Sequence, residues 1–351
     1  MKLITVIGTR PQFLKYIPLG LKLKNNKDIN NILVHSGQHY DEEMSKNILQ
    51  EFNINNFKYK ITKQGITQIE YIGYLMCKLE TIFLNEQPDK ILIFGDCDTT
   101  FATMFVSKRY DIPIIHVEGG MRGFNIKQPE EVNRIMIDHI SQVHLTSTHK
   151  AIENLNKENI IDNIYYIGNL QLELLDICLG FNNDENILKK YNIETDKYIL
   201  LTLHRHENTN VEYLSKIFQE FKNLEYKIIY PIHPRTKNII NQNNISIPNN
   251  VILINPVVYS ESVILIKNSV YVITDSGGVQ PEAWHLNKKC IVLQETTAWL
   301  DEIEANNNIL YNNFEIPLKK FIDDFLEIKT VSKSKDLVIP SEEIIDIILN
   351  N

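Results

Sequence analysis

The apolar positions of the chain fall into two series of short runs, each followed by glycine or polar residues. In the first series, runs rich in Ile, Leu and Val are separated by longer stretches with helical spacing. Runs of this length, bounded by turn residues, are typical of buried parallel strands, and the stretches between them predict helices. The expected strands are 3–7, 31–34, 90–94, 112–117, 143–145 and 164–167, with helices after Pro11, over 67–84 and from Pro129.

The second series begins near residue 198 and repeats the same alternation. Its expected strands are 198–201, 228–230, 251–254 and 270–273. Strands that alternate with helices twice over predict an α/β protein with two doubly wound, Rossmann-like domains and parallel sheets. We expect an N-terminal domain over 1–170 and a C-terminal domain over 171–351. Polar groups recur at the strand ends of both series, which predicts a ligand cleft between the domains.

The turn after the expected strand 270–273 is the most informative stretch. It reads Thr-Asp-Ser-Gly-Gly-Val-Gln-Pro-Glu-Ala over 274–283 and leads into helical spacing. Two glycines let a ligand approach the backbone, and we expect the amides of Ser276, Gly277 and Gly278 to point outward at a helix N-terminus, where an anion is favoured. Glu282, one helical turn on, could accept hydrogen bonds from a ribose diol. The alternative is an ordinary glycine-rich turn with a serine cap, and the turn alone leaves both interpretations open.

Net charge and cysteine usage restrict the partners. The formal net charge of −8 argues against nucleic acid and requires local basic groups for any anionic substrate. No apolar run approaches the ~20 residues of a membrane span, and Met-Lys leads directly into a strand, so we expect neither a signal peptide nor a membrane partner. Four scattered cysteines without metal-type spacing predict reduced thiols in a cytoplasmic protein.

Two basic residues stand where a helix disfavours them. Arg10 and Lys15 lie near the expected helix N-terminus after the first strand. Cations are unfavourable there, so their presence suggests an anionic ligand nearby. A solvated basic side chain is the alternative, and for Lys15 it is equally good.

Carboxylates and a histidine follow several expected strands. Asp96 and Glu118 come directly after two of them, where carboxylates in a cleft can act as general acids and bases. Each alone is more often a cap or turn residue. Glu130 and Arg134 have the i, i+4 spacing of a simple surface pair, which is the interpretation that spacing favours. His204 ends a strand of the second series among charged residues, which favours a functional role.

Familiar cofactor motifs are missing from the sequence. There is no Gly-x-Gly-x-x-Gly, no Walker loop and no HExxH. These absences matter if the substrate is a sugar. An enzyme that inverts a sugar carbon with NAD can first oxidise the sugar to a ketone, which makes the C–H bond next to the ketone acidic. Without NAD, the C–H bond must be made acidic in another way.

Seven motifs occur in an order that resembles one enzyme family. The chain is similar over nearly its whole length to the non-hydrolysing UDP-N-acetylglucosamine 2-epimerases. The motifs are Gly8-Thr9-Arg10-Pro11, Gly37-Gln38-His39, Gly95-Asp96, His116-Val117-Glu118-Gly119-Gly120-Met121-Arg122, Pro129-Glu130-Glu131-Val132-Asn133-Arg134, His204-Arg205-His206-Glu207-Asn208 and Thr274-Asp275-Ser276-Gly277-Gly278-Val279-Gln280.

The resemblance implies a fold and a reaction. The fold is the glycosyltransferase-B type, with a terminal helix packed back on the first domain. The reaction is C2 epimerisation of a UDP-2-acetamido sugar by anti elimination of UDP to 2-acetamidoglucal and re-addition, without cofactor or metal. It also implies a homodimer. By the resemblance, UDP is held by Arg10, Lys15, His204, Ser276, Gly277, Gly278 and Glu282, and the catalytic candidates are Asp96, Glu118, Glu130, Arg134 and His204.

The sequence departs from the family pattern at several positions. Gln12 and Pro281 each replace a usual Glu, and the run 296–299 ends in Trp299, where an Arg typically contacts the nucleotide. The run 38–44 lacks the motif linked to allosteric UDP-GlcNAc binding. Gln12 and Trp299 resemble the residues of those branches of the family that act on modified UDP-N-acetylhexosamines.

Three other functions are compatible with the same features. A retaining glycosyltransferase would share the fold and donor site. A hydrolysing 2-epimerase resembles Gly-Thr-Arg-Ala-Asp at the first turn, where this chain has Pro11-Gln12. A silent nucleotide-sugar sensor would not need Asp96, Glu118, Glu130 and His204.

Overall fold

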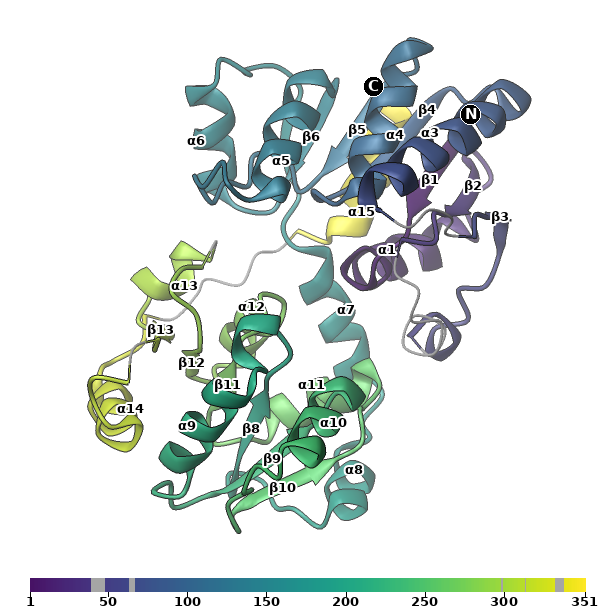
Figure 1. Ribbon diagram of the computed structural model, residues 1–351. Coiled ribbons are helices and arrows are strands. Elements are labelled where there is room, and N and C mark those ends of the chain that lie inside the picture. Colours follow the sequence, from purple (N-terminus) through teal and green to yellow (C-terminus); the bar gives the residue numbers. More distant parts are fainter. Residues whose placement is uncertain (39–47, 63–66, 298, 313, 332–337) are drawn as a thin grey trace. The chain divides into compact units, whose positions relative to one another are not determined.

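A computed structural model describes residues 1–38, 48–62, 67–297, 299–312, 314–331 and 338–351. The chain divides into two compact units. Unit 1 comprises Met1–Leu174 with Asp336–Asn351, and unit 2 comprises Leu175–Lys335 (Figure 1). Helix α7 (Leu170–Leu179) runs across the division.

Unit 1 contains a parallel sheet in the strand order β3-β2-β1-β4-β5-β6-β7. The order reverses between β1 and β4, as in a doubly wound fold. Its elements are β1 (Lys2–Ile7), α1 (Arg10–Leu23), β2 (Asn30–His35), β3 (Phe57–Lys60), α3 (Gln68–Glu86), β4 (Lys90–Phe94), α4 (Asp98–Arg109), β5 (Ile114–Val117), α5 (Pro129–Ile140), β6 (Val143–Thr146), α6 (His149–Lys157), β7 (Ile164–Tyr166) and α15 (Pro340–Asn350).

Unit 2 contains a second parallel sheet in the order β10-β9-β8-β11-β12-β13, which reverses between β8 and β11. Its elements are α8 (Asp184–Tyr191), β8 (Tyr198–Thr202), the 3₁₀ helix η1 (His206–Asn208), α9 (Val211–Phe221), β9 (Lys227–Pro231), α10 (Pro234–Gln242), β10 (Val251–Ile254), α11 (Tyr259–Lys267), β11 (Val272–Thr274), α12 (Val279–His285), β12 (Cys290–Val292), α13 (Leu300–Glu304), β13 (Asn308–Leu310) and α14 (Leu318–Glu327).

Both faces of the second sheet are buried, which explains the continuous apolar runs. Along β8, Ile199 and Leu201 belong to one hydrophobic cluster, and Tyr198 and Leu200 belong to another. Successive side chains of a strand point to opposite faces, so a strand covered on both sides must be apolar at every position. The predicted class, two doubly wound parallel α/β domains, is therefore confirmed.

Within the described residues, three strands lie outside the expected sets. β3 is an edge strand of four residues, Phe-Lys-Tyr-Lys, with alternating half-buried and exposed positions. β12 and β13 have three residues each, so the second set does not end at residue 273 as expected. Runs of three residues carry too little periodicity to be told from loops.

The C-terminal helix α15, yellow in Figure 1, packs against α1 of unit 1. Lys22 forms an ion pair with Glu342, and Lys90 Nζ donates to the carbonyl of Ile348 over 2.7 Å. The side chain of Glu173 accepts from the backbone amide of Ser341 over 2.9 Å. These contacts attach the C-terminal helix to unit 1.

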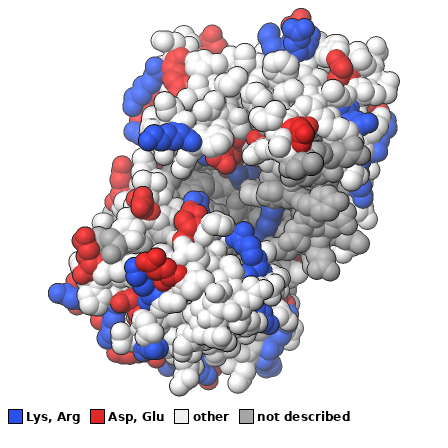
Figure 2. Space-filling model, viewed as in Figure 1, with Lys and Arg blue, Asp and Glu red and all other residues white. Residues whose placement is uncertain are grey.

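Basic and acidic side chains are interspersed over the face of the molecule that Figure 2 shows. Within the described part of the chain, no helix is both long enough and apolar enough to cross a membrane.

Candidate functional site

Three predicted site residues follow neighbouring strands at the reversal point of the first sheet. Arg10 opens α1 after β1, Asp96 follows β4, and Glu118 follows β5. The carboxyl ends of adjacent parallel strands meet at one edge of a sheet, and a reversal in strand order leaves a crevice there. Unit 1 therefore brings one basic and two acidic residues of the predicted site to the same edge of the sheet.

Glu118 lies in an unusual backbone conformation against the turn that carries Asp96. Its φ of 70° is left-handed, a region that costs a residue with a side chain roughly 1–3 kcal/mol. Its amide donates to the carbonyl of Leu145 over 2.9 Å. Its Oε2 lies 3.4 Å from where a Cβ at Gly95 would stand. The strained turn thus places the carboxylate beside the residue that precedes Asp96.

Lys15 forms an ion pair with Glu118, and both side chains are mostly buried. The family resemblance assigned Lys15 to the nucleotide. Within unit 1 this ammonium has a carboxylate partner, and its contact with the nucleotide stays a prediction.

Arg134 connects Asp96 to a carboxylate that we did not select from the sequence. Its Nη2 lies 2.5 Å from Asp96 Oδ2, and its Nη1 lies 2.6 Å from Glu131 Oε2. Arg134 therefore pairs with Asp96 and with the residue at i−3, rather than with Glu130 in the i, i+4 pair that spacing favoured. Glu130 is exposed in the first turn of α5.

Glu131 is buried and orients the guanidinium of Arg134. Its two oxygens also accept from the amides of Gly123 and Phe124, over 2.9 and 2.8 Å. Burial alone would raise the pKa of Glu131, but the Gly123 amide, the Arg134 guanidinium and the Phe124 amide together hold this pKa below its usual value. The i, i+3 spacing of Glu131 and Arg134 was a signal that could have identified this residue.

Gln12 is buried, and both ends of its side-chain amide bond to the protein. Oε1 accepts from the amides of Gly8 and Thr9 over 2.8 and 3.1 Å, and Nε2 donates to the carbonyl of Phe94 and to Thr100. Gln12 is 3% exposed, and these bonds join the turn after β1 to the end of β4. That Gln12 is typical of family branches that act on modified UDP-N-acetylhexosamines stays a prediction.

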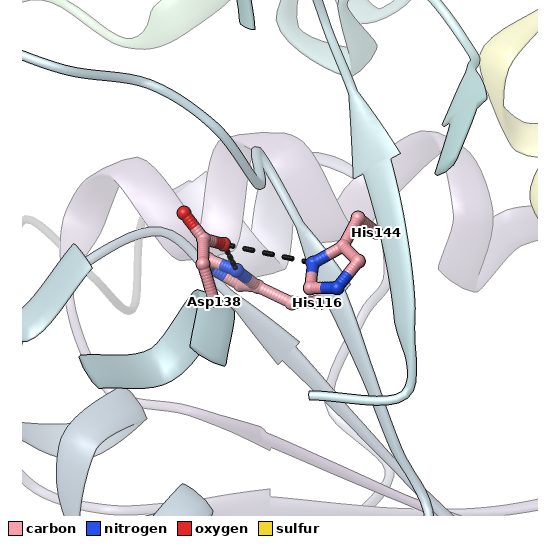
Figure 3. Close-up of side chains that lie close together, drawn as sticks. All are labelled: His116, Asp138 and His144. Atoms are coloured by element: carbon pink, nitrogen blue, oxygen red, sulfur yellow. Dashed lines mark hydrogen bonds and ion pairs between the residues drawn. The ribbon is translucent and has the colours of Figure 1, made fainter. Parts of the chain in front are cut away.

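The side chains of His116 of β5, Asp138 of α5 and His144 of β6 form a buried cluster (Figure 3). The Nδ1 of His116 lies 2.7 Å from Asp138 Oδ1, and the Nδ1 of His144 lies 3.8 Å from the same oxygen. Asp138 Oδ2 accepts from Arg122 over 2.7 Å and from the Gly120 amide over 3.0 Å. Burial alone would raise the pKa of Asp138, but His116, with His144 and Arg122, holds it well below its usual value.

His116, Asp138 and His144 have the side chains of a metal site, since their ligand atoms lie within 4.8 Å of one another. Both oxygens of the Asp138 carboxylate already make hydrogen bonds, however. Oδ1 bonds to His116, and Oδ2 accepts from Arg122 and from the Gly120 amide. Arg122 also neutralises its charge, so a divalent ion would have to enter beside a guanidinium. His116, Asp138 and His144 therefore form a structural cluster rather than a metal site.

In unit 2, the predicted residues also meet where the strand order reverses. Thr202 of β8 pairs with Thr274 of β11, so the turns that follow these strands are neighbours. His204 Nδ1 lies 3.0 Å from Asp275 Oδ1, and the amides of His204 and Arg205 donate to the same carboxylate. The His204 side chain is 52% exposed, so its ring is held at the Nδ1 side and open to solvent.

Asp275 is the central residue of this turn, and we assigned it no role from the sequence. It is fully buried and also accepts from the side chain of Asn208 over 3.2 Å. Burial alone would raise the pKa of Asp275, but the hydrogen bond and charge of His204 and the amides of Arg205 and His204 lower it. The sequence signal for this residue was its place directly after one expected strand, while His204 stands at the end of another.

The glycine turn differs in one detail from expectation. The amide of Ser276 donates to Thr274 Oγ1 over 2.9 Å, so it does not point outward as predicted. Residues 276–278 are half-buried and precede α12, with Gly278 as its N-cap. The indole Nε1 of Trp299 lies 3.8 Å from where a Cβ at Gly277 would stand, so this departure from the family pattern borders the turn.

Glu282 lies in the first helical turn as expected, but it is 2% exposed. The hydroxyl of Tyr259 donates to its Oε1 over 2.7 Å. Of the remaining departures from the family pattern, residues 39–44 of the run discussed for allosteric binding and residue 298 lie outside the described residues.

Comparison with known proteins gives a consistent result. The family model described as UDP-N-acetylglucosamine 2-epimerase matches residues 21–337. A UDP-N-acetylglucosamine 2-epimerase homolog of Methanococcus maripaludis is 36% identical over 332 residues, covering 93% of this chain and 92% of the relative. A UDP-2,3-diacetamido-2,3-dideoxy-D-glucuronate 2-epimerase of Pseudomonas aeruginosa is 32% identical over 315 residues, covering 88% of each.

A solved structure extends the likeness to the whole fold. The crystal structure of Methanocaldococcus jannaschii UDP-GlcNAc 2-epimerase, in complex with UDP-GlcNAc and UDP, matches with a TM-score of 0.89 at 33% identity and covers 100% of both chains. The glycosyltransferase-B type of fold that the resemblance implied is thereby confirmed.

Proposed function

This chain belongs to the UDP-N-acetylglucosamine 2-epimerase family, the epimerases that act on a UDP-sugar, and from that premise we propose how it inverts C2. UDP leaves C1 with the electron pair of the C1–O bond. A carboxylate removes the C2 proton, which forms the C1=C2 bond of a 2-acetamidoglucal. UDP then adds back to C1 while C2 receives a proton on its other face.

Physical chemistry favours this order of events. No carbonyl adjoins C2, so its proton is not acidic in the ground state. Departure of UDP builds positive charge at C1, and that charge acidifies the neighbouring C–H. Stabilising the leaving diphosphate is therefore the main task, and cations and amides aimed at it perform this task.

The two units divide the roles in our assignment. Residues His204, Ser276, Gly277, Gly278 and Glu282 of unit 2 bind UDP, with Arg10 of unit 1 as a further cation for the diphosphate. In unit 1 the acid and base candidates are Asp96, Glu118 and Glu130. Arg134 orients Asp96, and Lys15, a second cation for UDP in our assignment, also pairs with Glu118.

One observation carries this assignment. Two carboxylates follow adjacent strands β4 and β5, and each is held by its own cation. Protonation of one face of C2 and deprotonation of the other need two such groups. A site that only bound a nucleotide sugar would gain nothing from placing two carboxylates beside each other at this edge.

The substrate is a UDP-2-acetamido sugar. Relatives at comparable identity are named for UDP-N-acetylglucosamine and for a UDP-diacetamido-glucuronate, so both sugars are candidates. We further propose that the enzyme does not hydrolyse the nucleotide sugar and that it acts as a homodimer in the cytoplasm without cofactor or metal.

Proton NMR of the purified protein in D2O with a panel of UDP-N-acetylhexosamines tests the proposal. The expected result is deuterium at C2 of both epimers, with both recovered as UDP-sugars. Release of free sugar with UDP would indicate a hydrolysing epimerase. Exchange that requires a sugar acceptor would indicate a glycosyltransferase. No exchange with any sugar would contradict the proposal.

A further inference from the structure

Three consecutive carbonyl groups, at the end of β4 and in the turn that carries Asp96, each accept a hydrogen bond from a side chain of a different element. The distances are 2.9, 2.8 and 2.9 Å in chain order. The carbonyls belong to Phe94, Gly95 and Asp96, and the donors are Gln12 Nε2 of α1, His116 Nε2 of β5 and Asn133 Nδ2 of α5.

Such a turn does not need this support merely to fold. Carbonyls beyond the end of a parallel strand lie at the protein surface, where water can satisfy them. Here the carbonyls of Gly95 and Asp96 bond to side chains in place of water, and Gly95 adopts a left-handed φ of 63°. The Phe94 carbonyl, at the buried end of β4, accepts from Gln12 and also from Thr100 Oγ1 over 2.7 Å. Each of these bonds restrains the position of one carbonyl group.

The donor from β5 is itself fixed from behind. His116 is 1% exposed, with Nε2 at the Gly95 carbonyl and Nδ1 at the Asp138 carboxylate. Both ring nitrogens of His116 therefore face an oxygen acceptor. Asp138 in turn is held by Arg122, whose guanidinium makes a bidentate pair with Glu158 at 2.7 Å per bond.

We propose that Gln12, His116 and Asn133 are positioning residues that set the carboxylate of Asp96 by fixing three successive carbonyls of its backbone. Arg134, one residue after Asn133 on α5, binds the carboxylate of the same residue. Backbone and side chain of Asp96 are therefore fixed by neighbouring residues of one helix. This inference rests on the proposed role of Asp96 as an acid or base.

Two substitutions at His116 separate positioning from a structural role. In His116→Gln, the new side-chain amide reaches the place of Nε2, so it keeps the donor to Gly95 and loses Asp138. In His116→Asn, the shorter amide lies near the place of Nδ1, so it keeps Asp138 and loses Gly95. If His116 acts only through its contact with Asp138, His116→Asn should be the more active variant. If His116 positions the turn, His116→Gln should be the more active variant.

The experiment measures kcat and KM in the purified full-length protein, UDP binding by calorimetry, thermal stability, and hydrogen–deuterium exchange of the amides over 94–98. We expect His116→Asn to lose about 10–100-fold in kcat, since a shift of about 1 Å can cost that much. His116→Gln should keep several-fold more activity than His116→Asn. UDP affinity should stay unchanged in both.

Asn133→Ala provides a second test that does not disturb the buried cluster. Asn133 is half-buried on a helix, where alanine is favourable, so this variant should fold. We expect kcat to fall by roughly tenfold and the amides over 94–98 to exchange faster. Asn156→Ala, at an exposed position of α6, is the matched control and should change neither quantity.

The outcomes are distinct. Equal or greater activity of His116→Asn compared with His116→Gln, or unchanged kcat and exchange in Asn133→Ala, would overturn the inference. A wild-type protein that turns over no sugar would overturn the proposed function instead. In that case the exchange measurement still decides whether these side chains fix the turn.

Discussion

Arg134 Nη2 lies 2.5 Å from Asp96 Oδ2, which joins a residue of helix α5 to the turn after strand β4. The same guanidinium binds the buried Glu131 through Nη1. Burial alone would lower the pKa of Arg134, but the charges of Asp96 and Glu131 raise it. The guanidinium therefore stays charged and holds Asp96 in a fixed orientation at the edge of the sheet.

The first prediction concerns the two carboxylates at this edge. Asp96→Asn and Glu118→Gln should each lose about 10²-fold or more in turnover, because neither amide can exchange a proton with C2. Binding of UDP, measured by calorimetry, should persist in both. Glu153→Gln, on the exposed side of α6, is the control and should retain wild-type turnover. Near-normal rates in both site variants would end the assignment.

The second prediction uses the backbone strain at Glu118. A residue with a Cβ pays roughly 1–2 kcal/mol in the left-handed region, and glycine does not. Glu118→Gly should therefore be more stable than Glu118→Ala, although both should be inactive. Chemical denaturation measures the difference.

Glu130 supplies the opposite control, because it lies in helix α5. There glycine should be less stable than alanine by roughly 0.5–1 kcal/mol. If glycine were the less stable replacement at both positions, strain at Glu118 would not be a property of the protein.

The third prediction concerns Asp275 beneath His204. Asp275→Asn keeps the shape but removes the charge and presents an NH2 group to the amides of His204 and Arg205. We expect UDP affinity to fall by about 10–100-fold, which corresponds to ~1.4–2.7 kcal/mol. Asp301→Asn, exposed on α13, is the matched control. Unchanged UDP binding in Asp275→Asn would show that this turn does not hold the nucleotide.

The fourth prediction is a pH dependence of stability. The pKa of Asp138 is lowered in the folded protein, so the unfolded chain takes up this proton at a higher pH. The stabilisation by Asp138 is then complete above the unfolded pKa of about 3.9 and is lost as the pH falls below it. Unfolding midpoints measured from pH 7 downward should drop steeply only in the acid range.

Asp138→Asn should flatten that acid dependence and lower stability at pH 7 by about 3–5 kcal/mol, because it leaves His116 and Arg122 without their shared carboxylate. Asp162→Asn, at an exposed position, should do neither. An acid dependence that survives in Asp138→Asn would have to come from other carboxylates.

The sequence predicted the fold better than the site. Most strands could be identified because a strand buried on both faces is apolar at every position, which produces a continuous run. The strands missed are β3, β12 and β13, because runs of three or four residues show too little periodicity. Spacing also suggested the wrong partner for Arg134, because i, i+3 and i, i+4 neighbours are equally available on a helix. Asp138 and Asp275 could not be ranked from sequence, since their importance comes from burial among groups distant in the chain.

The central claim is that UDP leaves C1 during epimerisation. It is tested most directly with a UDP-2-acetamido sugar that carries a heavy oxygen isotope in the bridge between C1 and the β-phosphorus. We predict that the label moves into the non-bridging positions of the β-phosphate during turnover, because a departed diphosphate rotates before it adds back. Inversion of C2 with the label still in the bridge would contradict the claim.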